Sequence, residues 1–166
     1  MKKYFAYALY LLVLFLLQTA ALKVWSVAVP FVPQLVLLLA IVFALAHSLP
    51  ETLWFSFFAG FLLELFSAQF FGAQILAIVL TALTVYFITR RLTTQEISFL
   101  GASLLVVLST LFLGLWIFLY DGLISFLGFT EPLSWRSLLS FKIFWTIFVN
   151  LLFFYPVRAV FKLLPK

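Results

Sequence analysis

The sequence predicts an all-helical integral membrane protein, a bundle of six transmembrane helices that forms a single domain over residues 1–166. Two observations lead to this prediction: the chain is 67% hydrophobic and only 9% charged, and its apolar stretches are about as long as a bilayer is thick. A soluble domain is typically about 45–50% apolar and about 25% charged. A chain of this length also has too small an interior to bury 23 Phe. This composition argues against a soluble enzyme, a disordered regulator and a nucleic-acid-binding domain.

Six segments have the composition of membrane spans, which need about 17–25 mostly apolar residues. Backbone polar groups in lipid must be paired within the protein, and these segments lack the alternating pattern of barrel strands, so each is predicted to be a helix. The first is interpreted as a retained helix rather than a secretory signal, because no small-residue cleavage site closes it cleanly. The predicted helices cover about residues 4–22, 33–49, 52–66, 72–89, 97–120 and 138–161.

The connections carry turn-forming residues. Pro33 suits the first turn of the second helix, and Gly72 allows a backbone conformation that other residues disfavour. The only long connection covers residues 121–136, within which residues 123–129 are expected to form a short interfacial element. The third segment, 52–66, is short for a membrane span, since it would rise only about 22 Å at 1.5 Å per residue. It also carries Gly60 and Glu64, so we expect the helix to include residues 51–69 and its neighbours to shelter it from lipid.

The distribution of Lys and Arg predicts the orientation. With a cytoplasmic N-terminus and six spans, the outer side receives only Lys23, Arg136 and Lys142. The cytoplasmic side receives the remaining seven, which are Lys2, Lys3, Arg90, Arg91, Arg158, Lys162 and Lys166. An excess of positive charge on the cytoplasmic side is the usual pattern. Both termini are therefore predicted to be cytoplasmic.

Glu64 is the one acidic residue well inside a predicted span, and a carboxylate there is costly unless it is paired or reached by water. It follows Ser56 and Gly60 at four-residue spacing, on a face of small residues that lets another helix approach closely. The fourth segment offers Ala73, Ala77 and Thr81 at the same spacing. One interpretation makes Glu64 a binding or assembly residue. The other makes it a helix-end carboxylate that is hydrogen-bonded to a neighbouring group, with Gln69 and Gln74 as candidates.

The remaining polar residues do not form a catalytic pattern. The single His, His47, is expected at a membrane interface, and a lone His without Cys or clustered acids does not make a metal site. The sequence has neither a Gly-rich phosphate loop nor a nucleophile elbow. We expect no enzymatic activity, cofactor or metal. Polar side chains within the spans are expected to make interhelical hydrogen bonds, namely Gln18, Gln34, Thr146 and Asn150.

Segments two to four carry a family resemblance. Pro33-Gln34-Leu35-Val36-Leu37-Leu38-Leu39, then Phe58-Ala59-Gly60-Phe61-Leu62-Leu63-Glu64-Leu65-Phe66, then Phe71-Gly72, resemble the rod-shape-determining protein MreD family. The resemblance extends over about residues 33–91. Two positions depart from the family pattern: Gln34 stands where an acid is usual, and Glu64 stands where Asp is usual.

This resemblance implies a non-enzymatic scaffold of the bacterial cell-elongation complex in the cytoplasmic membrane. Its implied partners are an MreC-like protein, the actin-like MreB, the peptidoglycan polymerase–transpeptidase pair and membrane lipid. The implied fold is similar to that of the substrate-binding components of energy-coupling-factor transporters. The residues expected to serve helix packing or partner contact are Ser56, Gly60, Phe61, Glu64 and Gly72. The alternatives are a solute-binding component of a vitamin-type transporter and, less favoured, a lipid-handling enzyme.

Overall fold

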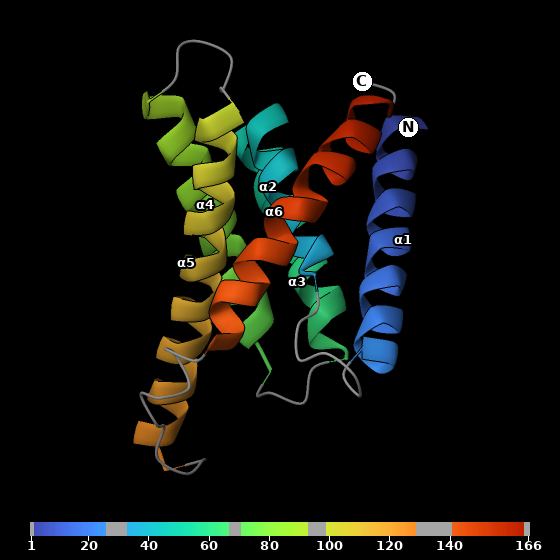
Figure 1. The fold of residues 1–166 in the computed structure, drawn as a ribbon. Coiled ribbons are helices and arrows are strands. Elements are labelled where there is room, and N and C mark those ends of the chain that lie inside the picture. The colour runs from blue at the N-terminus through green and yellow to red at the C-terminus, as the bar shows by residue number, and fades with distance from the viewer. Residues whose placement is uncertain (1, 26–32, 67–70, 93–98, 129–140, 165–166) are drawn as a thin grey trace.

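The computed structural model describes residues 2–25, 33–66, 71–92, 99–128 and 141–164. Over these residues the chain forms six helices and is all-helical, as predicted (Figure 1). They are α1 (Lys2–Trp25), α2 (Leu35–Ala46), α3 (Leu49–Glu64), α4 (Ala73–Leu92), α5 (Phe99–Phe126) and α6 (Phe141–Lys162). The start of α1 and the end of α6 lie at the same end of the bundle, which we call the N/C end.

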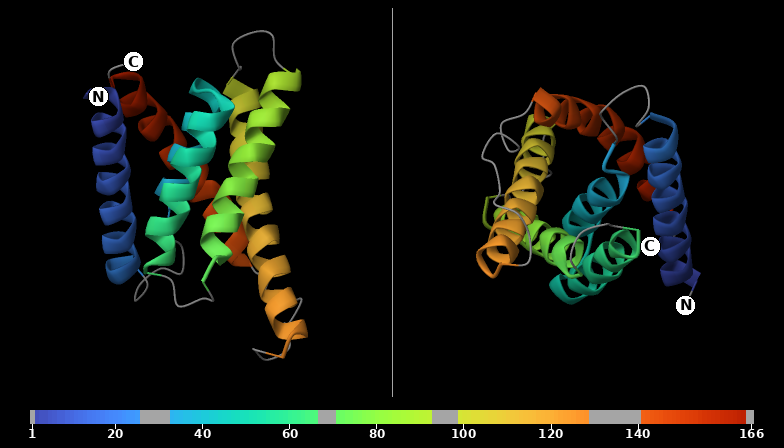
Figure 2. Two further views of the ribbon diagram at one scale, coloured as in Figure 1. Left: turned by 180° about the vertical axis from the view of Figure 1, so that it is seen from behind. Right: turned by 90° about the horizontal axis from the view of Figure 1, so that it is seen from below.

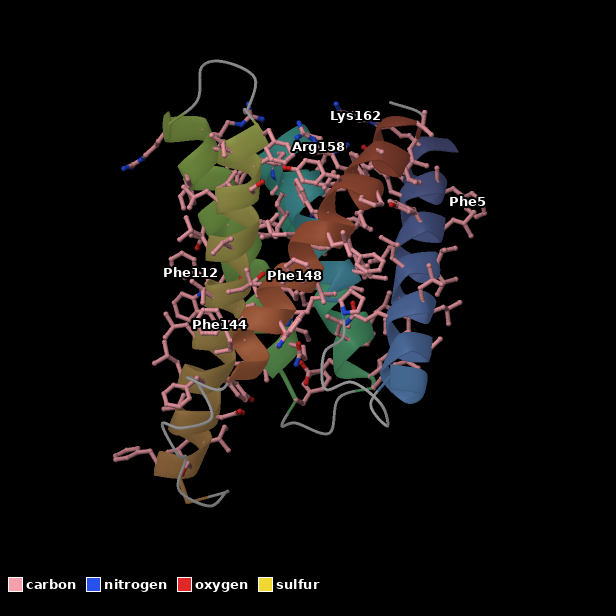
Figure 3. All side chains as sticks on the ribbon, in the orientation of Figure 1. Phe5, Phe112, Phe144, Phe148, Arg158 and Lys162 are labelled. Carbon is pink, nitrogen blue, oxygen red and sulfur yellow. The ribbon has the colours of Figure 1, made fainter. Side chains whose placement is uncertain are left out.

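Four of the helices are long and apolar enough to cross a membrane, namely α1, α4, α5 and α6. Large apolar side chains on the outer surface suit contact with lipid, among them Phe5, Phe144 and Phe148 (Figure 3). These features indicate a membrane protein. Helices α2 and α3 have only 12 and 16 residues, and at about 1.5 Å per residue both are shorter than the hydrocarbon core.

Helix α2 lies at the centre of the bundle. It contacts all five other helices, and the view from below shows it enclosed by them (Figure 2). Every residue from Leu35 to Ala44 is buried. This agrees with its sequence, because a helix that is apolar on all sides has no polar face to turn toward water.

The expectation that the third segment is sheltered from lipid is wrong. Helix α3 exposes Trp54, Phe58 and Phe61 on its outer side, and α2 is the sheltered helix. The reason is that α3 turns its small and polar residues inward and its large apolar residues outward, the arrangement that suits a lipid environment. The helix also begins earlier than predicted, because Ser48 and Glu51 form a capping box and Pro50 is accommodated in the first turn.

Helix α5 is longer than predicted. It continues past Tyr120 to Phe126, so residues 123–126 belong to it and do not start a separate interfacial element. The sequence suggested a break at Asp121-Gly122, but a Gly inside a helix costs only about 1 kcal/mol and does not end it. The last turns of α5 project beyond the other helices at the end opposite the N/C end (Figure 1).

The bundle brings the predicted cytoplasmic charges together. The start of α1, the end of α4 and the end of α6 all lie at the N/C end, and Arg158 and Lys162 are seen there in Figure 3. These three helix ends carry Lys2, Lys3, Arg90, Arg91, Arg158 and Lys162. Lys23 and Lys142 lie in helix segments at the opposite end, whereas Arg136 and Lys166 lie outside the described residues.

Candidate functional site

Glu64 caps the N-terminus of α4. It is the last residue of α3 and only 5% exposed. Its Oε2 accepts hydrogen bonds from the backbone N–H groups of Gln74, at 2.8 Å, and Ile75, at 3.3 Å. The first amides of a helix lack partners within the helix and carry a partial positive charge, so a carboxylate is stabilised there. Gln74 is thus a hydrogen-bond partner of Glu64 through its backbone, and Gln69 lies outside the described residues.

Gly60 sets how closely α3 approaches α4. A Cβ atom at Gly60 would lie 2.7 Å from the Cα of Ile75 and 3.1 Å from the carbonyl oxygen of Gln74. Only Gly permits this approach, because any side chain would collide with the backbone of α4. Four residues later, Glu64 meets the same two residues of α4. The absence of a side chain at Gly60 therefore brings the carboxylate within hydrogen-bonding distance of the amides.

Gly72 forms the turn that leads into α4. Its φ of +104° lies in the left-handed region that L side chains rarely adopt. The hydroxyl of Tyr120, from α5, donates a 2.8 Å hydrogen bond to the carbonyl of Phe71 beside it. This turn and its tether to α5 position the start of α4 over Glu64.

The inward face of α3 continues from Gly60 toward the N/C end through Ser56 and Thr52. Both side chains are fully buried, as is Thr81 of α4. Neither the three hydroxyls nor Oε1 of Glu64 has a hydrogen-bond partner among the described residues. The described residues also contain no group of three His, Cys, Asp or Glu that could hold a metal. The arrangement serves close packing of α3 on α4, and Ala73 and Ala77 are buried in α4 as the small-residue pattern predicts.

A second polar cluster lies at the start of α2. The side chain of Asn150, from α6, accepts a 2.9 Å hydrogen bond from the backbone N–H of Gln34. Its Nδ2 donates to Oε1 of Gln34 and to the hydroxyl of Thr110 in α5, both at 3.0 Å. From α1, Oε1 of Gln18 accepts a 3.0 Å hydrogen bond from the N–H of Val36. The first amides of α2 are thus capped by side chains from two other helices.

The predicted interhelical hydrogen bonds of Gln18, Gln34 and Asn150 are confirmed, but their convergence on a helix start was not anticipated. The only signal in the sequence was an isolated amide side chain in each of three predicted spans, because the apolar run after Pro33 itself resembles a membrane span. Figure 1 shows that α2 begins about midway along the bundle. An interior helix start leaves amides that water cannot satisfy, so amide side chains from neighbouring helices are needed there.

At the N/C end, His47 joins α2 to α3. Its Nε2 lies 3.2 Å from the hydroxyl of Tyr7, and its ring stacks on Phe43 with centroids 3.9 Å apart. Nη2 of Arg90 donates a 3.4 Å hydrogen bond to the backbone carbonyl oxygen of His47. Burial lowers the pKa of His47 below its ordinary value of 6.5, and the charge of Glu51 partly opposes this effect. These contacts tie α1 and α4 to the connection between α2 and α3.

The structure divides the predicted site residues into two groups. Gly60, Glu64 and Gly72 meet around the start of α4, and Ser56 is buried on the same face of α3. Phe61 instead lies at the outer surface, 36% exposed. In comparisons with protein-family models, with curated proteins and with solved structures, nothing matches this chain.

Proposed function

We propose that the protein is a non-enzymatic scaffold of the bacterial cell-elongation complex, similar to MreD, and that it binds an MreC-like protein with a single transmembrane helix. The observation that carries the proposal is the arrangement around the start of α4. Gly60, Glu64 and Gly72, on which the family resemblance rests, act together to hold α3 against α4. Residues that act together in one packing arrangement support the family resemblance more strongly than a chance match between apolar segments would.

The second position of the resemblance supports the same proposal. Gln34 stands where the family usually has an acid, and it lies at the start of α2 as Glu64 lies at the start of α4. Gln34 makes no side-chain cap of its own, since its side-chain oxygen accepts from Asn150, so the two positions share only their location at a helix start that another helix caps. The architecture proposed with this function is similar to that of the substrate-binding components of energy-coupling-factor transporters.

The proposed location is the bacterial cytoplasmic membrane, with both termini in the cytoplasm. The positively charged ends of α1, α4 and α6 share the N/C end, and this clustering supports the orientation by the positive-inside pattern. MreB, which is cytoplasmic, and the polymerase–transpeptidase pair are proposed as further members of the same assembly.

The outer side of α3 is the proposed contact with the partner helix. A groove of about 570 Å³ runs beside α3, with Leu53, Trp54 and Phe57 on one wall and Val79 of α4 on the other. Its apolar lining suits the side chains of a transmembrane helix. Phe61 extends the same exposed side of α3. In this proposal Ser56, Gly60 and Glu64 act from the interior by fixing the position of α3.

Co-purification with an MreC-like protein tests the proposal. The two proteins are co-expressed and extracted in mild detergent, and the partner is expected to remain bound. Replacing Phe57 and Phe61 with Ala is expected to reduce the retained partner severalfold. The matched control replaces Phe144 and Phe148, which are also exposed, on α6. If both proteins are folded and no complex forms, the scaffold proposal fails.

The alternative function is a solute-binding component of a vitamin-type transporter. The polar cluster around Gln34 and Asn150 is the observation that would favour it, because transporter sites gather polar groups near broken helices inside the membrane. However, the donors and acceptors of Asn150 are engaged by other helices. A rise in melting temperature with a vitamin, in the absence of any partner, would favour this alternative.

A further inference from the structure

A groove between α1 and α3 offers a binding site for a lipid. Its volume is about 450 Å³, within the range of about 300–1,000 Å³ that is usual for small-molecule sites. Its walls are formed mainly by Tyr4, Tyr7 and Leu11 from α1 and by Trp54, Phe55 and Phe58 from α3. The groove exists because α1 packs mainly on α2 and contacts α3 only slightly.

The groove runs from the N/C end toward the middle of the bundle. The two helices run in the same direction, and Tyr4 of α1 lies beside Glu51 of α3, since its hydroxyl donates a 3.4 Å hydrogen bond to Oε1. Leu11 and Phe58 each lie seven residues further along, which is about 10 Å deeper at 1.5 Å per residue. The groove therefore has a polar mouth at the charged end of the bundle and an apolar interior, as an amphiphile requires.

The mouth presents an acid beside a base. Glu51 Oε2 accepts short hydrogen bonds from the hydroxyl and the N–H of Ser48, at 2.8 and 3.2 Å. Among the described residues, its Oε1 has only two longer contacts, with the hydroxyl of Tyr4 at 3.4 Å and with Nζ of Lys3 at 4.0 Å. Both charged side chains are partly exposed. Oε1 of Glu51 can therefore accept a closer hydrogen bond from a cationic donor, and the ammonium group of Lys3 can form an ion pair with an anion beside that donor.

We propose that this groove binds phosphatidylethanolamine, with one acyl chain between α1 and α3, the headgroup ammonium on Oε1 of Glu51 and the phosphate beside Lys3. The headgroup carries the two charges that the mouth complements, side by side. Phosphatidylglycerol has no amine for Glu51, and the quaternary amine of phosphatidylcholine cannot donate a hydrogen bond. This site depends on the protein lying in a membrane and not on the proposed scaffold function.

Native mass spectrometry of the purified full-length protein tests the headgroup. The protein is titrated with phosphatidylethanolamine, phosphatidylcholine and phosphatidylglycerol of identical acyl chains. The wild type is expected to retain phosphatidylethanolamine at least fivefold better than the other two. Glu51→Gln preserves the capping box with Ser48 and is expected to reduce this preference below twofold. Equal retention of the three lipids, or an unchanged preference in Glu51→Gln, would overturn the proposal.

A pair of α1 variants tests the position of the acyl chain. Ala8 lines the groove and Leu9 faces outward on the same helix. Ala8→Phe fills the groove and is expected to lower retention of phosphatidylethanolamine at least fivefold, whereas Leu9→Phe leaves it unchanged. Ala8→Leu, a smaller change, is expected to give an intermediate loss and serves if Ala8→Phe does not fold. Undiminished retention of phosphatidylethanolamine in the folded Ala8 variants would place the lipid elsewhere and refute binding in the groove. Since no partner protein is present, the result is independent of the co-purification experiment.

Discussion

Helices α2 and α4 both begin at backbone amides that another helix caps, but the capping groups differ. The start of α2 is capped by the neutral amides of Asn150 and Gln18. The start of α4 is capped by the carboxylate of Glu64. Each cap is a side chain that reaches the helix from a different element, so neither helix start is complete without tertiary packing.

The positions of the two helix starts explain the difference. Helix α2 begins about midway along the bundle, whereas α4 begins near the end opposite the N/C end (Figures 1 and 2). A carboxylate deep in a membrane protein loses its hydration, at a cost of several kcal/mol. An amide satisfies the same N–H groups without a charge. Near the end of the bundle the boundary of the membrane is closer, and the partial positive charge of the helix start offsets part of the cost of a charged cap.

The largest expected effect is at Asn150. Replacing it with Leu leaves the N–H and the side-chain oxygen of Gln34 without this partner, whereas the hydroxyl of Thr110 keeps its 2.8 Å hydrogen bond to the carbonyl of Val106. At about 1–3 kcal/mol for each unsatisfied buried group, the expected loss is on the order of 4 kcal/mol. Thermal unfolding in detergent measures it. A loss below about 1 kcal/mol would contradict the role assigned to this cap.

Asn150→Asp examines whether neutrality matters at this site. The variant keeps the shape of the side chain but places a carboxylate in the interior, where loss of hydration costs several kcal/mol. The atom that replaces Nδ2 is an oxygen, which has no proton to donate to the side-chain oxygen of Gln34. The melting temperature of the variant at pH 7.5 is therefore expected to fall below that of wild type. Equal stability at pH 7.5 would refute the explanation by charge.

At the start of α4, Glu64→Ala is expected to cost about 3 kcal/mol, because hydrogen bonds to charged groups contribute about 1.5–3 kcal/mol. Glu64→Gln keeps an acceptor and loses only the charge, so it is expected to lose clearly less. Thermal unfolding of the two variants separates the acceptor from the charge. If the two losses are equal, the charge and not the hydrogen-bond acceptor stabilises the helix start.

Gly60→Ala tests whether the close helix contact holds Glu64 in place. The added methyl group would lie 2.7 Å from the Cα of Ile75 and force α3 away from α4. The expected cost is about 2 kcal/mol, within the usual range for overpacking. Gly114→Ala is the matched control, because a Cβ there has no atom within 4 Å. Similar melting temperatures for the two variants would contradict the close contact.

The smallest expected effect is at Ser48, which caps its own helix. The capping box of Ser48 and Glu51 is local, and Ser48→Ala is expected to cost about 1 kcal/mol, as is typical of N-cap substitutions. Its melting temperature should fall less than that of Glu64→Ala. A fall as large as that of Glu64→Ala would remove the distinction between local and tertiary caps.

Some features of these helix starts could be identified from the sequence, and others could not. The apolar segments, the polar side chains within them and the small-residue face with Gly60 and Glu64 could be identified from the sequence, and Ser48 stands at a recognisable N-cap position. The central position of α2 could not be identified, because its apolar run resembles a lipid-facing span. The short length of the third segment, with Gly60 and Glu64 inside it, favours a sheltered helix, whereas the exposed aromatic residues of α3 suit an outer face.

The sequence by itself determined that the protein is built from apolar helices, roughly which residues they cover, and which helix ends carry positive charge. Composition and local capping decide these features, because each feature depends on residues that are close together in the sequence. Only the tertiary structure decided that α2 is central and that Asn150 and Glu64 cap α2 and α4. Those hydrogen bonds join residues 116 and 10 positions apart. Their formation depends on how the helices pack, which no local pattern specifies.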